Sequence, residues 1–270
     1  MTQWEKFKDT YLTERGGDLE RALDALTPQQ WIFVVSAFDR TFWMRMRGGK
    51  DNISASYAAE LIGLGYKSGK AIWALEHEGI EPPPVGEVQQ RKMNNGLANE
   101  EKLKDEMAIA LEGNGLYVVK KCGTLCKDGF SCTPDAILLD FRNPDAPEYT
   151  NVEIKSTESD NTFSSEWPTD NHAIQVLMQQ RLLDSVCGSV LLYHHTGNNS
   201  KKAYWFPRNR AVEEAIALAC VAAREEMKQN AYSVAALKAK KDAVTRILHP
   251  YYHTTRLVDP SFLSKENKKE

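Results

Sequence analysis

The sequence predicts an α/β fold in which a central mixed β-sheet is flanked by helices and preceded by a helical N-terminal elaboration. Three observations predict it. Over most of the first 112 residues, apolar residues recur at three- and four-residue intervals, which is the period of a helix. After Gly113-Asn114-Gly115 the pattern changes to short apolar runs bounded by turn residues, which is typical of strands. Strand and helix patterns then alternate, and this favours a sheet covered by helices.

The N-terminal part is expected to be helical. Residues 2–26 carry a helical pattern that Gly16-Gly17 interrupts. Thr27-Pro28 has the form of an N-cap followed by proline at the first helical position, so a helix is expected from Gln29 to about Met46. Further helices are expected at Ser54 to Leu64, Ala71 to His77 and Gln89 to Glu112.

The rest of the chain alternates between the two periods. The expected strands are Leu116 to Lys121, Pro134 to Phe141, Tyr149 to Thr157, Ser189 to His194 and Ala203 to Pro207. The expected helices are His172 to Val186, Arg210 to Gln229 and Val234 to Leu248. The polar stretch from Asp160 to Asn171 is expected to be irregular, and the charged tail from Ser264 to be mobile. We divide the chain into a helical extension at residues 1–38, a main domain at 39–230, and a C-terminal helix and tail at 231–270, together one compact unit.

Composition bounds the function. The 270 residues, 42% of them hydrophobic, suffice for one large domain or a domain with an appendage. A net charge of −3 and a pI of about 6.1 exclude a globally basic nucleic-acid binder, but they leave room for a locally basic groove. The segment from Met1 to Lys6 is no signal peptide, and no apolar run is long enough to cross a bilayer. We therefore expect a cytoplasmic protein without a membrane partner.

The five cysteines raise the question of a metal site. Cys122, Cys126 and Cys132 are close enough in sequence for zinc or an iron–sulfur cluster, but Cys187 and Cys220 do not obviously supply a fourth ligand. Free thiols in a reducing compartment are the expected state.

One pair of predicted strands carries the chemistry. Glu153 and Lys155 are two residues apart, so their side chains project from the same face of a strand. Val152 and Ile154 then point the other way, into a core. With Asp135 on the neighbouring strand, the pattern predicts a site for a hard cation beside a proton-handling amine. Such a site suits metal-assisted hydrolysis of a phosphodiester.

Four ordered blocks lie between about residues 40 and 210. They are Arg45-Met46-Arg47-Gly48 leading into Ile53-Ser54-Ala55-Ser56, Gly96-Leu97-Ala98-Asn99-Glu100, Pro134-Asp135 with Glu153-Ile154-Lys155, and Gln175-Val176-Leu177-Met178-Gln179. In this order the blocks resemble the PD-(D/E)xK nucleases, and more narrowly the lambda exonuclease family of viral and phage recombination exonucleases. The resemblance implies a restriction-endonuclease-like core.

The resemblance also assigns ligands for a cofactor. It implies that Asp135, Glu153 and the carbonyl of Ile154 bind Mg²⁺ or Mn²⁺, as two ions, and that Glu100 reaches the same ions from its helix. Glu100 also has a plain interpretation as a solvated helix carboxylate.

Lys155 and Gln175 complete the expected catalytic set. Lys155 would orient or deprotonate the attacking water. Gln175 would form a hydrogen bond near Lys155 or the scissile phosphate. An exposed strand lysine and a polar helix face are the alternatives.

A basic stretch is the candidate for gripping DNA. Between residues 40 and 50 there are four cationic side chains and no acid. The resemblance implies a pocket for a terminal 5′ phosphate, with candidates Arg45, Arg47, Ser54 and Ser56. Which arginine contacts the phosphate is open, and a solvated charged turn is the alternative.

Together these features predict a metal-dependent deoxyribonuclease that digests one strand of linear duplex DNA from its 5′ end in recombination or repair. The resemblance implies a ring-shaped homotrimer and a partner single-strand annealing protein. An endonuclease on the same fold and a DNA-binding protein that has lost the chemistry are the alternatives.

Overall fold

The computed structural model describes residues 52–65 and 86–260, apart from residues 112, 144–145, 147, 184–185 and 230–232. The helices expected at residues 2–26, Gln29 to Met46 and Ala71 to His77 lie outside this range, as do the extension at residues 1–38 and the tail from Ser264.

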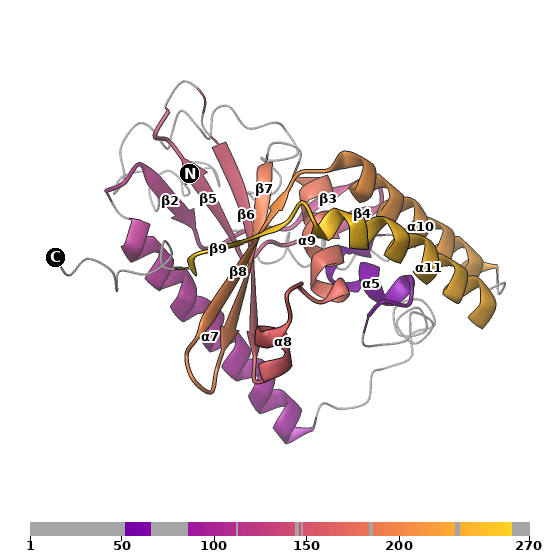
Figure 1. Cartoon of the computed structure of the whole chain (residues 1–270), viewed down its shortest axis with the longest axis horizontal. Coiled ribbons are helices and arrows are strands. Elements are labelled where there is room, and N and C mark those ends of the chain that lie inside the picture. Colours follow the sequence, from indigo (N-terminus) through magenta and orange to yellow (C-terminus); the bar gives the residue numbers. More distant parts are fainter. Residues whose placement is uncertain are drawn as a thin grey trace, which may run out of the picture.

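A six-stranded mixed sheet is the centre of the fold, with strand order β2-β5-β6-β7-β8-β9 (Figure 1). The strands are β2 (Leu116–Val119), β5 (Ala136–Asp140), β6 (Glu148–Thr157), β7 (Val186–His195), β8 (Lys201–Pro207) and β9 (Arg256–Val258). β6 and β7 pair in parallel, and the other neighbours are antiparallel. The five strands expected from the sequence are all present, and β6, which carries Glu153 and Lys155, is an inner strand.

Helices cover both faces of this sheet. On one face, α7 (Glu87–Leu111) packs against Val118, Leu138, Val152 and other apolar side chains. On the other face lie α9 (Asp170–Leu182), α10 (Arg210–Lys228) and α11 (Val234–Tyr252), whose buried side chains share one core with Leu139, Leu191 and Tyr193. Among the described helices, none is both long and apolar enough to cross a bilayer.

A small second sheet has the order β1-β4-β3 and was not predicted. It consists of β1 (Ile53–Ser54), β3 (Leu125–Lys127) and β4 (Phe130–Cys132). Strands of two or three residues are too short to show a period. The turn between β3 and β4 depends on positive φ angles, 51° at Asp128 and 75° at Gly129.

Several local predictions were wrong. The helix expected from His172 to Val186 ends at Leu182, and Val186 already belongs to β7. The helix expected from Ser54 to Leu64 begins instead as β1, because Ile53 and Ser54 pair with distant residues of β4; only η1 (Ala55–Tyr57) and α5 (Ala58–Leu61) are helical. The stretch expected to be irregular from Asp160 holds α8 (Asp160–Ser164) and the first turn of α9. β9, which pairs with β8, was also missed.

The start of β5 determines where the site forms. A strand was expected from Pro134, but β5 begins at Ala136, and the last β5–β6 pair joins Ala136 to Val152. Continuing this register places Pro134 opposite Ile154, and proline has no N–H to give to an antiparallel ladder. β6 therefore runs on to Thr157 beside β7, while the β5 ladder has stopped.

The attachment of α7 to the sheet yields a prediction about stability. Met107 is 1% exposed and packs in the core between α7 and the sheet, whereas Ile109 on the same helix is 51% exposed. We expect Met107→Ala to lower the free energy of unfolding by about 2–5 kcal/mol. Ile109→Ala should change it by about 0.5 kcal/mol or less. Urea denaturation measures both, and equal losses would contradict this packing of α7.

Candidate active site

The candidate site lies at the edge of β6 that β5 leaves open. Asp135 is half-buried there, and its Oδ2 accepts the N–H of Ile154 at 2.7 Å. On a strand, the N–H and C=O of one residue point to the same edge, so the carbonyl of Ile154 also faces this opening. Pro134, the residue opposite, cannot donate to it. The Asp135 carboxylate and the Ile154 carbonyl are thereby brought to one side of β6.

Glu153 is the most deeply buried carboxylate of the site, at 1% exposure. Its Oε1 accepts Nε2 of Gln175 at 2.5 Å, its Oε2 accepts Nε2 of Gln179 at 2.6 Å, and Nζ of Lys155 lies 2.6 Å from Oε1. A buried charge is tolerated when it is paired and hydrogen-bonded, as both oxygens are here. Glu153 and Lys155 share a face, as their spacing predicts, while Val152 and Ile154 enter the core beneath α7.

Gln179 is a site residue that the sequence analysis did not single out. It follows Gln175 by one helical turn and so lies on the same face of α9. Nδ2 of Asn151 donates to Oε1 of Gln179 at 2.8 Å, which leaves the Gln179 amide nitrogen to donate to Glu153. The four-residue spacing on α9 was the signal that could have found it.

Glu100 approaches from α7, on the other face of the sheet. Its Oε1 lies 2.8 Å from Nζ of Lys104, which also contacts Oε1 of Glu101 at 2.5 Å. Lys104 is 4% exposed, and the sequence did not identify it, because a Glu–Lys pair four residues apart is common on exposed helices. Burial lowers the pKa of Lys104, but its bonds to Glu100 and Glu101 outweigh this and raise the pKa overall.

The negative charges act on one another. Burial, followed by the charges of Glu153 and Glu100, holds the pKa of Asp135 well above its usual range. Burial alone would lower the pKa of Lys155, but the charges of Glu153 and Asp135 outweigh it and raise the pKa. The site therefore holds a lysine that is protonated and an aspartate that resists ionisation.

The donor set fits a hard divalent cation in chemistry and charge. Three carboxylates and a backbone carbonyl are the oxygen ligands that Mg²⁺ and Mn²⁺ take, and a cation would relieve the repulsion felt by Asp135. As they stand in the described part of the chain, no three His, Cys, Asp or Glu side chains are grouped to hold an ion. Glu153 and Glu100 instead bond to amides and lysines, which an ion would have to displace.

A neutral histidine adjoins Lys155. Tyr193 pairs with Lys155 across the β6–β7 ladder, and its hydroxyl lies 2.8 Å from Nδ1 of His172. Burial, and then the positive charge of Lys155, lower the pKa of His172 to about 3. His194 and His195 are buried on β7.

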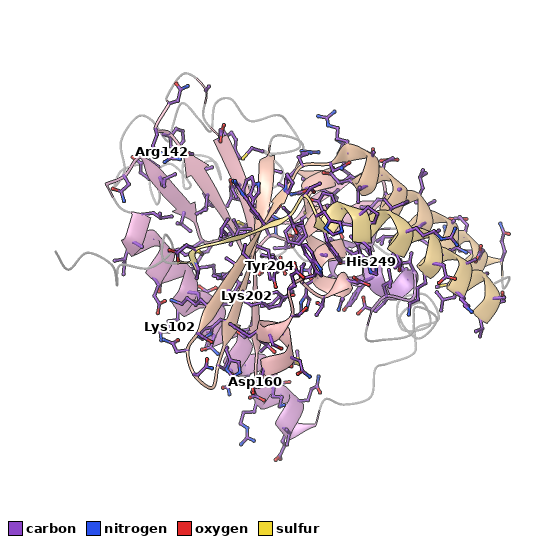
Figure 2. All side chains as sticks on the ribbon, in the orientation of Figure 1. Lys102, Arg142, Asp160, Lys202, Tyr204 and His249 are labelled. Carbon is purple, nitrogen blue, oxygen red and sulfur yellow. The ribbon has the colours of Figure 1, made fainter. Side chains whose placement is uncertain are left out.

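The segment that links Lys155 to α9 is fixed from β7 and β8. Nζ of Lys202 donates to the carbonyls of Phe163 and Ser165 at 2.8 and 2.5 Å, and Tyr204 also donates to Ser165. At the other end of α8, Nε2 of His195 lies 3.1 Å from Oδ1 of Asp160. Figure 2 shows Lys202 and Tyr204 on the sheet and Asp160 on α8. These bonds fix the position of the segment between Lys155 on β6 and Gln175 on α9.

The expected phosphate-binding residues are only partly placed. Ser54 and Ser56 bond to each other at 2.8 Å, and Ser54 pairs with Ser131 on β4, the strand that leads to Asp135. Arg45 and Arg47 lie outside the described residues. No disulfide joins any of the five cysteines, and burial raises the pKa of Cys132 well above its usual value.

Comparison with solved structures shows the fold. The chain is similar to an alkaline exonuclease, LHK-Exo, from Laribacter hongkongensis, with 16% sequence identity, a TM-score of 0.50, and coverage of 76% of this chain and 98% of that chain. A structure of LHK-Exo in complex with dAMP gives 13% identity, a TM-score of 0.46, and coverage of 75% and 96%. No protein-family model and no curated protein match the sequence.

The chain thus has a nuclease-like fold, that of an alkaline exonuclease: a central mixed sheet flanked by helices. The predicted α/β fold with a central mixed sheet flanked by helices is confirmed, while the predicted helical N-terminal elaboration lies outside the described residues.

The charge balance at Asp135 yields a prediction about pH. An aspartate whose pKa is higher in the folded than in the unfolded chain opposes folding at any pH above the unfolded-state pKa. Below that pKa it has no such effect, because it is protonated in both states. At neutral pH without divalent ions, we expect Asp135→Asn to increase the free energy of unfolding by about 0.5–2 kcal/mol. The gain should vanish as the pH falls below the ordinary value of 3.8, and thermal unfolding at several pH values measures it.

Asp140 supplies the control with the opposite sign. Its bonds to Arg142 lower its pKa, so Asp140→Asn should lose stability at neutral pH. Loss of stability in both variants would contradict the charge balance described for Asp135.

Proposed function

We propose that this protein is a divalent-metal-dependent deoxyribonuclease that digests one strand of linear duplex DNA from its 5′ end. The observation that carries the proposal is the convergence of Asp135, Glu153, Lys155 and the Ile154 carbonyl at the open edge of β6. The fold of an alkaline exonuclease supports it.

Asp135, Glu153 and the carbonyl of Ile154, joined by Glu100, would hold two Mg²⁺ or Mn²⁺ ions. A divalent ion bound there lowers the pKa of a water molecule and offsets the charge of the phosphate. Burial, and then the charges of Glu153 and Glu100, raise the pKa of Asp135, and a cation bound there would favour its ionised form.

Lys155 acts on the attacking water. Because its pKa is raised, it is an ammonium that donates hydrogen bonds and orients the attacking water. It can accept the proton of that water only when the charges of Glu153 and Asp135 are offset. Gln175 and Gln179 hold the Glu153 carboxylate in place, and α9 anchors both amides.

The remaining parts of the proposal concern DNA and partners. Arg45, Arg47, Ser54 and Ser56 would grip the terminal 5′ phosphate. The substrate is duplex DNA with 5′-phosphate ends, the protein is a cytoplasmic homotrimer that acts in recombination or repair, and a single-strand annealing protein takes the product strand.

Degradation of end-labelled linear duplex DNA in Mg²⁺ or Mn²⁺ tests the activity. We expect Asp135→Ala and Lys155→Ala to lower turnover by at least about 10²–10⁴-fold, because each removes a group that acts on the reacting atoms. Both should keep the fold and bind DNA. Asp105→Ala and Lys120→Ala, which break an exposed ion pair, are the matched controls.

Closed circular DNA and the two DNA ends separate the alternatives. Cutting of the circle would indicate an endonuclease. Release of label from the 3′ end first would contradict the polarity. Binding without cutting in either metal would indicate a DNA-binding protein that has lost the chemistry.

The 5′-phosphate pocket has its own test. We expect Arg47→Ala to reduce the preference for 5′-phosphorylated over 5′-hydroxyl ends by about 10–100-fold. This corresponds to the loss of one hydrogen bond to a charged group, which contributes about 1.5–3 kcal/mol. The ratio of initial rates on the two substrates measures it. An unchanged ratio in Arg47→Ala and a reduced ratio in Arg45→Ala would assign the contact to Arg45, and unchanged ratios in both would reject the pocket.

A further inference from the structure

A groove lies beside the candidate active site. It is formed between the N-terminal half of α7 and the C-terminal end of β6 and has a volume of about 820 Å³. Its lining includes Asn99 and Ser156, the chain neighbours of Glu100 and Lys155. Figure 1 shows this half of α7 running past the end of β6 towards α8. The groove therefore borders the candidate site on the α7 side of the sheet, near Glu100, while the side chains of Glu153 and Lys155 lie on the opposite face of β6.

The lining mixes polar and apolar surface. Amide and hydroxyl side chains predominate among its residues, namely Asn95, Asn99, Ser156, Thr157, Ser159 and Thr196. Its charged members are Lys92 and Glu158. Such a lining suits a ligand that has both hydrogen-bonding groups and apolar faces, as nucleotides have.

Gly96 marks the wall of the groove on α7. A glycine inside a helix costs about 0.5–1 kcal/mol relative to alanine. Packing explains some glycines of this fold: a Cβ at Gly188 would lie 2.4 Å from the Trp205 ring. A Cβ at Gly96 would meet no described atom within 4 Å, so packing in the described structure does not require glycine there. Its effect is to leave the α7 backbone open to the groove.

An ion pair spans the groove. Nζ of Lys92 on α7 lies 3.4 Å from Oε2 of Glu158, which follows β6. The two side chains are 64% and 69% exposed. A pair this exposed contributes about 0–1 kcal/mol, so an entering phosphate can take Lys92 from Glu158 at little cost.

We propose that this groove binds a single strand of the substrate next to the scissile bond. The nucleotides pass against the bare helix backbone at Gly96, the amides and hydroxyls bond to bases and sugars, and Lys92 contacts one phosphate. The inference rests on the proposed function and adds to it the path of the strand.

Filling the groove at Gly96 tests the proposal. Gly96→Leu is compared with Asn94→Leu, which places the same side chain at an exposed position of α7 outside the groove. The probe is a fluorescent single-stranded DNA oligonucleotide, and anisotropy is measured with Ca²⁺ in place of Mg²⁺. Gly96→Leu should weaken binding at least ten-fold without lowering the unfolding temperature, because leucine favours a helix more than glycine does. Asn94→Leu should bind as the wild type does.

Salt dependence tests the ion pair. Lys92→Gln should lower the slope of log K against log salt concentration by about 0.7, the value for one phosphate contact on a single strand. Glu158→Gln should tighten binding by releasing Lys92. An unchanged slope together with unchanged affinity in Glu158→Gln would overturn the role of Lys92.

Degradation of linear duplex DNA by the wild type separates this inference from the proposed function. If the wild type degrades DNA and Gly96→Leu binds the oligonucleotide equally well, the groove proposal is overturned, a protein partner becomes the candidate occupant, and the nuclease proposal stands. If the wild type neither binds nor degrades DNA, both are overturned.

Discussion

The rest of the site depends on the burial of one carboxylate on an inner strand. Glu153 is 1% exposed, and its charge is tolerable only because both oxygens have partners. That requirement determines what surrounds it: Gln175 and Gln179 must share one face of α9, Asn151 must orient the second amide, and Lys155 must stand two residues along β6. The packing of α9 on the sheet and the geometry of the site therefore depend on the same contacts with Glu153.

Those partners satisfy Glu153 but not the charges around it. Asp135 and Glu100 add negative charge at the same opening, while Lys155 and Lys104 supply the positive charge. Burial, together with the charges of Glu153 and Glu100, raises the pKa of Asp135. Ionising this carboxylate therefore opposes folding, and selection for stability alone would not favour it there. The proposed divalent cation would stabilise the ionised form, so the cost in stability would accompany the proposed binding of the ion.

The sequence predicted what short-range periodicity controls. The spacing of two between Glu153 and Lys155 was enough to place them on one face, and strand propensity was enough to locate β5 and β6 within about two residues. It did not predict features set by distant contacts. β1 forms because Ile53 pairs with Phe130, which no local pattern reveals. The burial of Lys104 depends on how α7 lies on the sheet. The four-residue spacing from Glu100 to Lys104 does not reveal it, because the same spacing is found on helices that are exposed to water.

The helix α7 joins the core, the site and the groove. Its buried side chains, Leu103, Lys104, Met107 and Leu111, all lie in its C-terminal part, which is therefore the part that the sheet anchors. Glu100 stands at the boundary. The N-terminal part, with Val88 and Leu97 both 61% exposed, continues beyond that anchor. A helix held at one end extends a wall beside the candidate site without filling the space below it. The groove forms because the buried side chains of α7 begin only at Leu103, about one turn after Glu100, so the part of the helix before Glu100 is not packed onto the sheet.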